Sequence, residues 1–273
     1  MDASVIQRQY NDVIAEHYDH DPQSVTGDSL DRALDQLQGE GLLSDVLPAL
    51  KVLDVGMGTG MFLKKLRARS GRSIEPFGID LSEQMMAVAK AKLPDLVSAV
   101  DDAANIDDHF CDESFGLIST HFVTGFVPVE HLAPRIFTKL APGGYWSFVG
   151  GMSRGYGELQ RKSSTPLMKF LFGGRQPDLQ GLKCPDDQSE VEQELRRGGL
   201  ELITAHTFEP ELQFRNFDEF MEYGYRGGWL TPFIEEVGLH RAGRIQRAVL
   251  NKLIFPVVDH HNIVIALAQK PRQ

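Results

Sequence analysis

Hydrophobic residues along the chain alternate between short continuous runs and helical spacings. Continuous apolar runs predict buried strands at 51–55, 75–79, 96–100, 115–120 and 145–149. Apolar residues three or four positions apart predict helices at 61–69, 82–92 and 129–140. Strands that alternate with helices in this way are typical of an α/β fold, in which a parallel sheet is wound with helices on both faces.

Less regular segments lie on either side of this alternation. Helical spacing predicts further helices at 4–18, 28–47, 167–172, 189–197, 217–225 and 232–255. Two more apolar runs predict strands at 200–208 and 263–269. We expect one domain over residues 1–273.

A glycine-rich segment, VLDVGMGTG, follows the first predicted strand. Gly56, Gly58 and Gly60 permit positive φ and a close approach of a ligand to the backbone, and the next helix offers free N–H groups. This geometry suits a nucleoside with a carboxylate tail. The spacing is G-x-G-x-G, whereas a dinucleotide site needs G-x-G-x-x-G and would place its third glycine at Met61. A phosphate-binding G-K-[ST] is also missing, so nicotinamide and triphosphate cofactors are disfavoured.

Asp80 ends the second predicted strand. A carboxylate there can accept hydrogen bonds from both hydroxyls of a ribose. The alternative is that Asp80 only caps the next helix, but Ser82 is better placed for that role. Ribose binding is therefore favoured.

Four segments together resemble class I S-adenosylmethionine-dependent methyltransferases. They are VLDVGMGTG, GIDLSEQMMAVAKAKL, VDDAANI and LAPGGYWSF, and the resemblance covers about residues 50–150 plus the last strand. It implies a Rossmann-like, doubly wound, mostly parallel sheet of seven strands with the last antiparallel. The cofactor-binding core would comprise 46–150 and 198–212 with 262–270, and helical cap insertions would comprise 1–45, 151–190 and 215–258. The implied cofactor is S-adenosyl-L-methionine, with S-adenosyl-L-homocysteine as product.

The resemblance also implies roles for single residues. Asp54 and the Gly56–Gly60 backbone would hold the methionine moiety, although Met57 stands where the family usually has Gly, Ala or Cys. Asp102 would accept from the adenine amine, with Asp101 as the alternative because the doubled acid blurs the register. The opening helix of the family carries a tyrosine that closes over the cofactor; here Tyr18 either has this role or is an ordinary helix residue. The expected cofactor-binding residues are Tyr18, Asp54, Gly56, Met57, Gly58, Gly60, Asp80, Leu81, Met85, Asp101, Asp102, Ala103 and Thr120.

The acceptor is expected beyond the carboxyl ends of the strands. His121, near the end of the fourth strand, would either act as a base or line the pocket. His260 and His261 precede the last strand, and surface or structural roles are expected for both. The cap is rich in aromatic residues, which either pack on one another or form an apolar acceptor pocket. The residues expected in that pocket are Tyr10, Phe122, Trp229 and Phe233.

The amino-acid composition limits the kinds of partner that the protein is expected to bind. The formal charge of −10 disfavours nucleic acid, and two basic stretches, at 154–175 and 241–247, are either solvated helix faces or attract an anionic substrate. The two cysteines form no C-x-x-C pair, and no residue set has metal-ligand spacing. No secretory signal and no apolar stretch of about 20 residues is seen, so a cytoplasmic location without stable membrane insertion is expected. The sequence leaves open whether the chain forms a homodimer.

The sequence thus predicts a methyltransferase acting on a small, mostly apolar or aromatic metabolite by in-line transfer, with O-methylation slightly favoured over C- or N-methylation. The alternative is a non-catalytic S-adenosylmethionine-binding sensor or scaffold.

Overall fold

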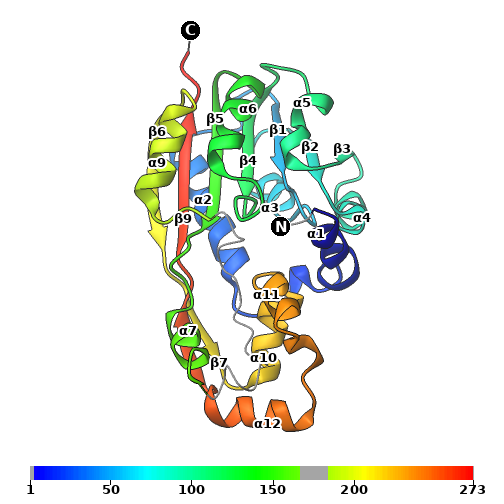
Figure 1. Ribbon diagram of the computed structural model, residues 1–273. Helices are drawn as coiled ribbons and strands as arrows, with labels where there is room; N and C mark the ends of the chain where they lie inside the picture. Colours follow the sequence, from blue (N-terminus) through cyan, green and yellow to red (C-terminus); the bar gives the residue numbers. More distant parts are fainter. Residues whose placement is uncertain (1–2, 167–183, 273) are drawn as a thin grey trace.

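A seven-stranded sheet forms the centre of the upper part of the molecule in Figure 1. The computed structural model describes residues 3–166 and 184–272, so the helix expected at 167–172 lies outside the described residues. The strands are β1 (Leu50–Val55), β2 (Ile74–Asp80), β3 (Val97–Val100), β4 (Phe115–His121), β5 (Leu140–Gly151), β6 (Glu201–Phe208) and β9 (Ile263–Gln269). Their order is β3-β2-β1-β4-β5-β9-β6; β9 is antiparallel to both neighbours, and the other pairs are parallel. The predicted Rossmann-like fold is confirmed.

Helices cover both faces of this sheet. On one face lie α2 (Val25–Gly39), α3 (Met61–Arg69) and α4 (Glu83–Lys92), and on the other lie α5 (Ile106–His109), α6 (Val129–Lys139) and α9 (Gln188–Arg197). The first six residues of β9 are all buried, because both of its faces are covered. This explains why the sequence of β9 is a continuous apolar run rather than an alternating one.

The N-terminal segment is less regular than its hydrophobic spacing predicts. The helix expected at 4–18 is instead α1 (Ala3–Gln9), a π-helical turn η1 (Tyr10–Ile14) and a 3-10 turn η2 (Tyr18–His20). The helix expected at 28–47 ends at Gly39, shortly before Gly41 adopts a φ of +71°. An α-helix cannot continue through that left-handed backbone.

The lower part of Figure 1 holds a second group of elements, which we call the lower lobe. It comprises α7 (Gly157–Ser163), β7 (Glu211–Phe214), α10 (Phe217–Met221), a π-helical turn η5 (Glu222–Arg226), α11 (Thr231–Glu236), a 3-10 turn η6 (Leu239–Arg241), α12 (Arg244–Leu253) and β8 (Val257–His260). Strands β7 and β8 form a separate antiparallel pair. Phe214, Phe217 and Phe255 belong to a buried cluster that also includes Val149 of β5 and Ile265 of β9. The lobe therefore packs directly on the carboxyl end of β5 and the start of β9.

The helix expected at 232–255 is broken into α11, η6 and α12. Gly238 has a φ of +73° and Gly243 is extended, so each interrupts the helical path. Strands β7 and β8 have no counterpart in the prediction, because four alternating residues give too short a pattern. The proposed division of the chain into a core and a cap stays a prediction.

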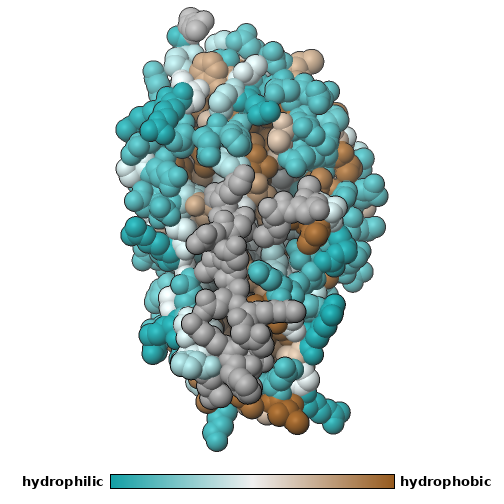
Figure 2. All heavy atoms as spheres, viewed as in Figure 1, coloured by the Kyte–Doolittle hydropathy of each residue, from teal (hydrophilic) through white to brown (hydrophobic). Residues whose placement is uncertain are grey.

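On the face seen in Figure 2 the described residues are mostly hydrophilic, with an apolar area at the lower end of the view, where α12 lies. Ile245 of α12 is 82% exposed. Over the described ranges 3–166 and 184–272, no helix is long and apolar enough to cross a membrane.

Candidate functional site

The glycine loop after β1 adopts the backbone that its sequence predicts. Gly56, Gly58 and Gly60 have φ values of +68°, +54° and +74°, a region that favours glycine. A Cβ at Gly56 would stand 2.4 Å from Cγ2 of Val123, so a side chain there would displace the segment after β4. The loop thus lets the chain pass tightly between the ends of β1 and β4.

The side chain of Asp80 connects the glycine loop to the start of α4 through two hydrogen bonds. The backbone N–H of Gly58 donates to its Oδ2 at 2.7 Å, and that of Ser82 donates to its Oδ1 at 2.9 Å. Ser82 is the N-cap residue of α4, and its Oγ accepts from the N–H of Met85 at 3.1 Å, as expected. Burial raises the pKa of Asp80, and the two backbone donors partly offset this effect. The Asp80 carboxylate is therefore not needed as a helix cap and lines a cavity instead.

That cavity, which we call the loop cavity, has a volume of about 140 Å³. Ten of the residues expected in the cofactor site, base position or acceptor pocket line it: Tyr10, Tyr18, Gly56, Gly58, Asp80, Leu81, Asp102, Ala103, His121 and Phe122. The described residues that line it without having been predicted are Ile6, Gln7, Ser82, Val123, Phe126 and Val127. The predicted residues come from η1, η2, the glycine loop and the ends of β2, β3 and β4, so segments far apart in sequence converge here. Their roles toward a cofactor stay predictions.

Three other expected cofactor residues lie behind the cavity wall and are not among its lining residues. The side chain of Met57 packs against Gly78 of β2, where a Cβ would stand 2.1 Å from its Sδ. Met85 is fully buried against Ile14 of η1. Thr120 is buried, and its Oγ1 accepts from Nε1 of Trp146 at 2.9 Å. These side chains support the site from within the core.

The two adjacent acidic residues after β3, Asp101 and Asp102, lie in different surroundings. Asp102 lines the loop cavity and caps the 3-10 turn η3 (Ala103–Asn105). Asp101 does not line it, but accepts from Asn105 Nδ2 and pairs with His109 Nε2 at 2.8 Å. His109 and Asn105 lower the pKa of Asp101 to about 2. The geometry therefore favours Asp102 over Asp101 as the residue that faces a ligand.

Asp54 is a buried carboxylate at the end of β1. It is 2% exposed, and the hydroxyl of Ser119 donates to its Oδ1 at 2.7 Å. Burial raises the pKa of Asp54 to about 7, although the Ser119 hydroxyl lowers it and the charge of Asp80 adds to the rise. Gly60, the last loop glycine, packs on Ala89 and Leu93 of α4. Neither Asp54 nor Gly60 lines the loop cavity.

His121 is buried at the end of β4. Its Nε2 lies 3.1 Å from Oγ of Ser147, and Phe62 packs edge-on at 4.3 Å between ring centroids. Its Nδ1 has no hydrogen-bond partner among the described residues. Burial lowers the pKa of His121 to about 3, so the imidazole is neutral at physiological pH. His121 lines the loop cavity, and its buried, neutral ring has the capacity for one further hydrogen bond at Nδ1.

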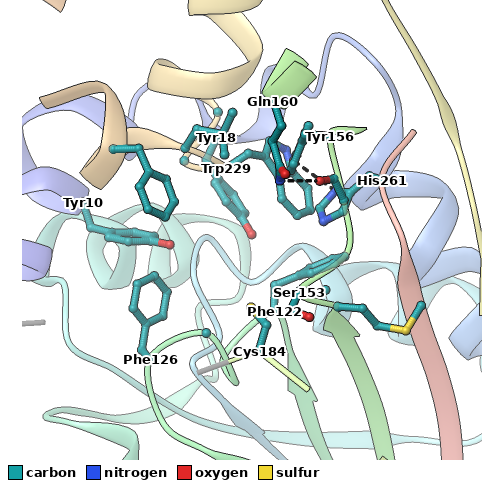
Figure 3. A pocket seen from close by; sticks show the side chains of 18 residues that line it. Tyr10, Tyr18, Phe122, Phe126, Ser153, Tyr156, Gln160, Cys184, Trp229 and His261 are labelled. Carbon is teal, nitrogen blue, oxygen red and sulfur yellow. Dashed lines mark hydrogen bonds between the residues drawn. The ribbon is translucent and has the colours of Figure 1, made fainter. Parts of the chain in front are cut away.

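A second cavity of about 170 Å³, the aromatic cavity, adjoins the first. Tyr10, Tyr18, Phe122 and Phe126 line both. Trp229 and Phe233, which were expected at the acceptor, line the aromatic cavity. Figure 3 shows Tyr10 and Phe126 on one side of it, Tyr156 and His261 on the other, and Trp229 between them.

Sequence reasoning missed several residues at this second site, and three of them lie together. His261, expected to be a surface or structural residue, is 5% exposed and lines the aromatic cavity with Tyr156, while Tyr223 lies buried directly behind them. No pattern marks these residues, because they come from η5, from the start of α7 and from the β8–β9 connection. His260, its neighbour, is exposed.

A doubly wound sheet with a glycine loop, a strand-end Asp80 and an Asp102–Ala103 pair beside one cavity is the arrangement in which Rossmann-like folds bind nucleoside cofactors. Residues 52–144 match the family model described as a methyltransferase domain. This match covers about a third of the chain and agrees with the resemblance to methyltransferases that the sequence shows.

Known proteins resemble the chain in part of its sequence and in its fold. The chain is 27% identical over 155 residues to "Sterol methyltransferase-like 3" of Botryococcus braunii; the match spans 55% of this chain and 39% of that protein. The YcgJ protein of Bacillus subtilis superposes with a TM-score of 0.58 at 16% identity, over 89% of this chain and all of that one. Phosphoethanolamine N-methyltransferase 2 of Haemonchus contortus, solved with S-adenosyl-L-methionine, gives 0.50 at 19% identity over 88% of this chain and 52% of that one. At these identities the structures support the fold.

Proposed function

We propose that the chain transfers a methyl group from S-adenosylmethionine to a small, mostly apolar or aromatic acceptor. The observation that carries this proposal is the pair of adjoining cavities. One holds ten of the sequence-predicted residues, the other is walled largely by aromatic rings, and four aromatic residues line both. A sensor or scaffold protein would not need the second cavity.

The residues of the loop cavity fit the cofactor. S-adenosylmethionine supplies an electrophilic methyl group on a positively charged sulfur. Asp80 and Asp102 are the acidic groups among the described lining residues, and no described lining residue is a lysine or arginine. The glycine loop leaves room beside Tyr18, whose Cε1 would lie 3.6 Å from a Cβ at Gly58. We therefore assign the ribose to Asp80 and the adenine to Asp102 and Ala103.

The shared aromatic residues would separate the methyl donor from water. Tyr10 and Phe126 pack edge-to-face with centroids 5.9 Å apart, and Phe122 packs on Trp229 at 4.8 Å. Aromatic faces attract a cation, and a closed apolar wall keeps water from competing with the acceptor. These residues would thereby align the acceptor with the methyl group.

His121 would act as a hydrogen-bond acceptor that orients the reacting group. Its depressed pKa makes it a weak base, so it does not ionise an acceptor hydroxyl beforehand. A weak base is sufficient for O-methylation, because the hydroxyl proton becomes strongly acidic as the new carbon–oxygen bond forms. Preference for oxygen over carbon or nitrogen stays a prediction, as do the cytoplasmic location, the exclusion of nucleic acid and a homodimer.

Calorimetry tests the cofactor site. We expect S-adenosylhomocysteine to bind and NAD not to bind. Asp102→Ala should weaken S-adenosylhomocysteine by roughly tenfold or more, because a charged hydrogen bond contributes about 1.5–3 kcal/mol. Asp101→Ala is the matched control and should leave the affinity unchanged. The opposite pattern would refute the assignment of the adenine.

Activity is tested by incubating the protein and methyl-labelled S-adenosylmethionine with a metabolite extract. Label in an extractable small molecule is expected, and it should disappear with Asp80→Ala. Tight cofactor binding without any labelled product would favour a sensor or scaffold protein instead.

A further inference from the structure

Three polar side chains meet at one wall of the aromatic cavity. The hydroxyl oxygens of Tyr156 and Tyr223 are 3.0 Å apart, and each lies 3.3 Å from Nδ1 of His261. Tyr156 and His261 line the cavity itself, opposite Tyr10 and Phe126 (Figure 3). We call these three residues the Tyr–His cluster.

Features of the local backbone hold Tyr156 and His261 in place. Tyr156 has a left-handed backbone with a φ of +60°, which a tyrosine rarely adopts. Its N–H donates to the carbonyl of His260 at 3.0 Å, which ties the start of α7 to β8. A Cβ at Gly151 would stand only 3.0 Å from Nε2 of His261. The lack of a side chain at Gly151 therefore leaves space for the imidazole ring. Backbone strain of this kind persists at sites where a side chain has to be held in one place.

The cluster has more hydrogen-bonding capacity than it uses internally. With the imidazole proton on Nε2, one hydroxyl donates to Nδ1 and the other donates to the first oxygen, so the Nε2–H stays free. With the proton on Nδ1, that N–H and one hydroxyl form the internal bonds, and the second hydroxyl proton stays free. In both tautomers one donor and several oxygen lone pairs remain for a ligand.

All three groups are neutral near pH 7. Burial lowers the pKa of His261 to about 3 and raises the pKa of Tyr156 and of Tyr223 above the ordinary value of a tyrosine. The nearest buried carboxylate, Asp259, is engaged with the N–H groups of Leu159 and His260. None of the described residues that line the aromatic cavity is Asp, Glu, Lys or Arg. Such a site favours a neutral polar group over a carboxylate or phosphate, whose charge would stay unpaired.

The position of the cluster indicates which end of a ligand it meets. Trp229 contacts Phe122 at 4.8 Å on one side and His261 at 4.7 Å on the other, and it stacks on Tyr223. Phe122 also lines the loop cavity. None of the three cluster residues lines the loop cavity, so the cluster borders a part of the aromatic cavity that the loop cavity does not share.

We propose that the Tyr–His cluster is a recognition subsite for a neutral hydroxyl or carbonyl group at the end of the acceptor that points away from the cofactor. This inference rests on the proposed function, because it takes the aromatic cavity as the acceptor site. The substrate class is then an apolar or aromatic molecule with a remote, uncharged oxygen.

Three naphthalene probes test the subsite by calorimetry on the full chain. In the presence of S-adenosylhomocysteine, 2-naphthol should bind about tenfold more tightly than naphthalene, the factor expected for one net hydrogen bond. 2-Naphthoate should bind more weakly than 2-naphthol. Equal affinities for naphthol and naphthalene, or tighter binding of naphthoate, would overturn the proposal.

Substitutions inside and outside the Tyr–His cluster test whether the cluster causes the preference for naphthol. Tyr156→Phe and His261→Asn should each abolish the preference for naphthol, while Tyr145→Phe in β5, outside both cavities, should keep it. Unchanged S-adenosylhomocysteine affinity in the variants shows that they are folded. A preference that survives both cluster substitutions would refute the assignment. A chain that shows this preference but labels no metabolite would refute the proposed function and leave the subsite intact.

Discussion

Replacing Asp54 with Asn should stabilise the protein while it weakens cofactor binding. Asp54 is buried at the end of β1, where the hydroxyl of Ser119 donates a hydrogen bond to its side chain. Asn has nearly the same shape and can accept from the same hydroxyl. The substitution therefore removes a charge and little else.

The size of the effect depends on pH. The pKa of Asp54 is about 7 in the folded chain, against 3.8 for an ordinary Asp. Between these values the unfolded chain has lost the proton and the folded chain retains it, so stability falls as the pH rises. A shift of about three units corresponds to a cost of as much as about 4 kcal/mol at pH 8. At pH 4.5 the cost is only about 1 kcal/mol by the same relation.

Thermal unfolding at the two pH values measures this difference. For a chain of this size 1 kcal/mol corresponds to roughly 2 °C, so Asp54→Asn should raise the Tm by about 8 °C at pH 8 and by about 2 °C at pH 4.5. Asp45→Asn, at an exposed position, is the control and should change the Tm little at either pH. A variant that is less stable than the parent at pH 8 would refute the reasoning. Calorimetry should also show weaker S-adenosylhomocysteine binding, if Asp54 holds the methionine moiety.

Three further substitutions test the supports of the site. Gly56→Ala places a Cβ 2.4 Å from Val123 in a left-handed backbone, so S-adenosylhomocysteine binding should be lost, as calorimetry would show. Ser82→Ala removes the N-cap of α4 and should cost about 1 kcal/mol in denaturant unfolding. Trp229→Ala removes the ring between Phe122 and His261 and should raise the KM for the acceptor while the S-adenosylhomocysteine affinity stays within about twofold.

The sheet and its cofactor motifs could be predicted because local patterns specify them. Strands covered on both faces have continuous apolar runs, and the three loop glycines are needed by their own backbone. The lower lobe could not be predicted in the same way. Its strands β7 and β8 are four residues long, and its helical stretch is interrupted at Gly238 and Gly243 by backbone conformations that spacing does not show.

The residues of the candidate site can also be divided into those that the sequence predicts and those that it does not. Asp80 and Asp102 lie at strand ends, where topology alone places them at the loop cavity. The Tyr–His cluster depends on how α7, η5 and the β8–β9 connection pack together, which is a tertiary property. Asp101 shows the same limit on a smaller scale, because only the turn after β3 decides which of two adjacent acids faces the cavity.

Four energetically costly features lie in or beside the walls of the two cavities, while others, such as the positive φ of Ser24 and Glu113, lie elsewhere. Asp54 is ionised only at a cost, and Nδ1 of His121 has no partner within residues 3–166 and 184–272. Phe122 and Tyr156 have φ values near +60°. Each feature opposes stability and could be removed by a single substitution, yet all four lie in or beside cavity walls. At these four positions the cost is consistent with the binding role that we propose for the two cavities.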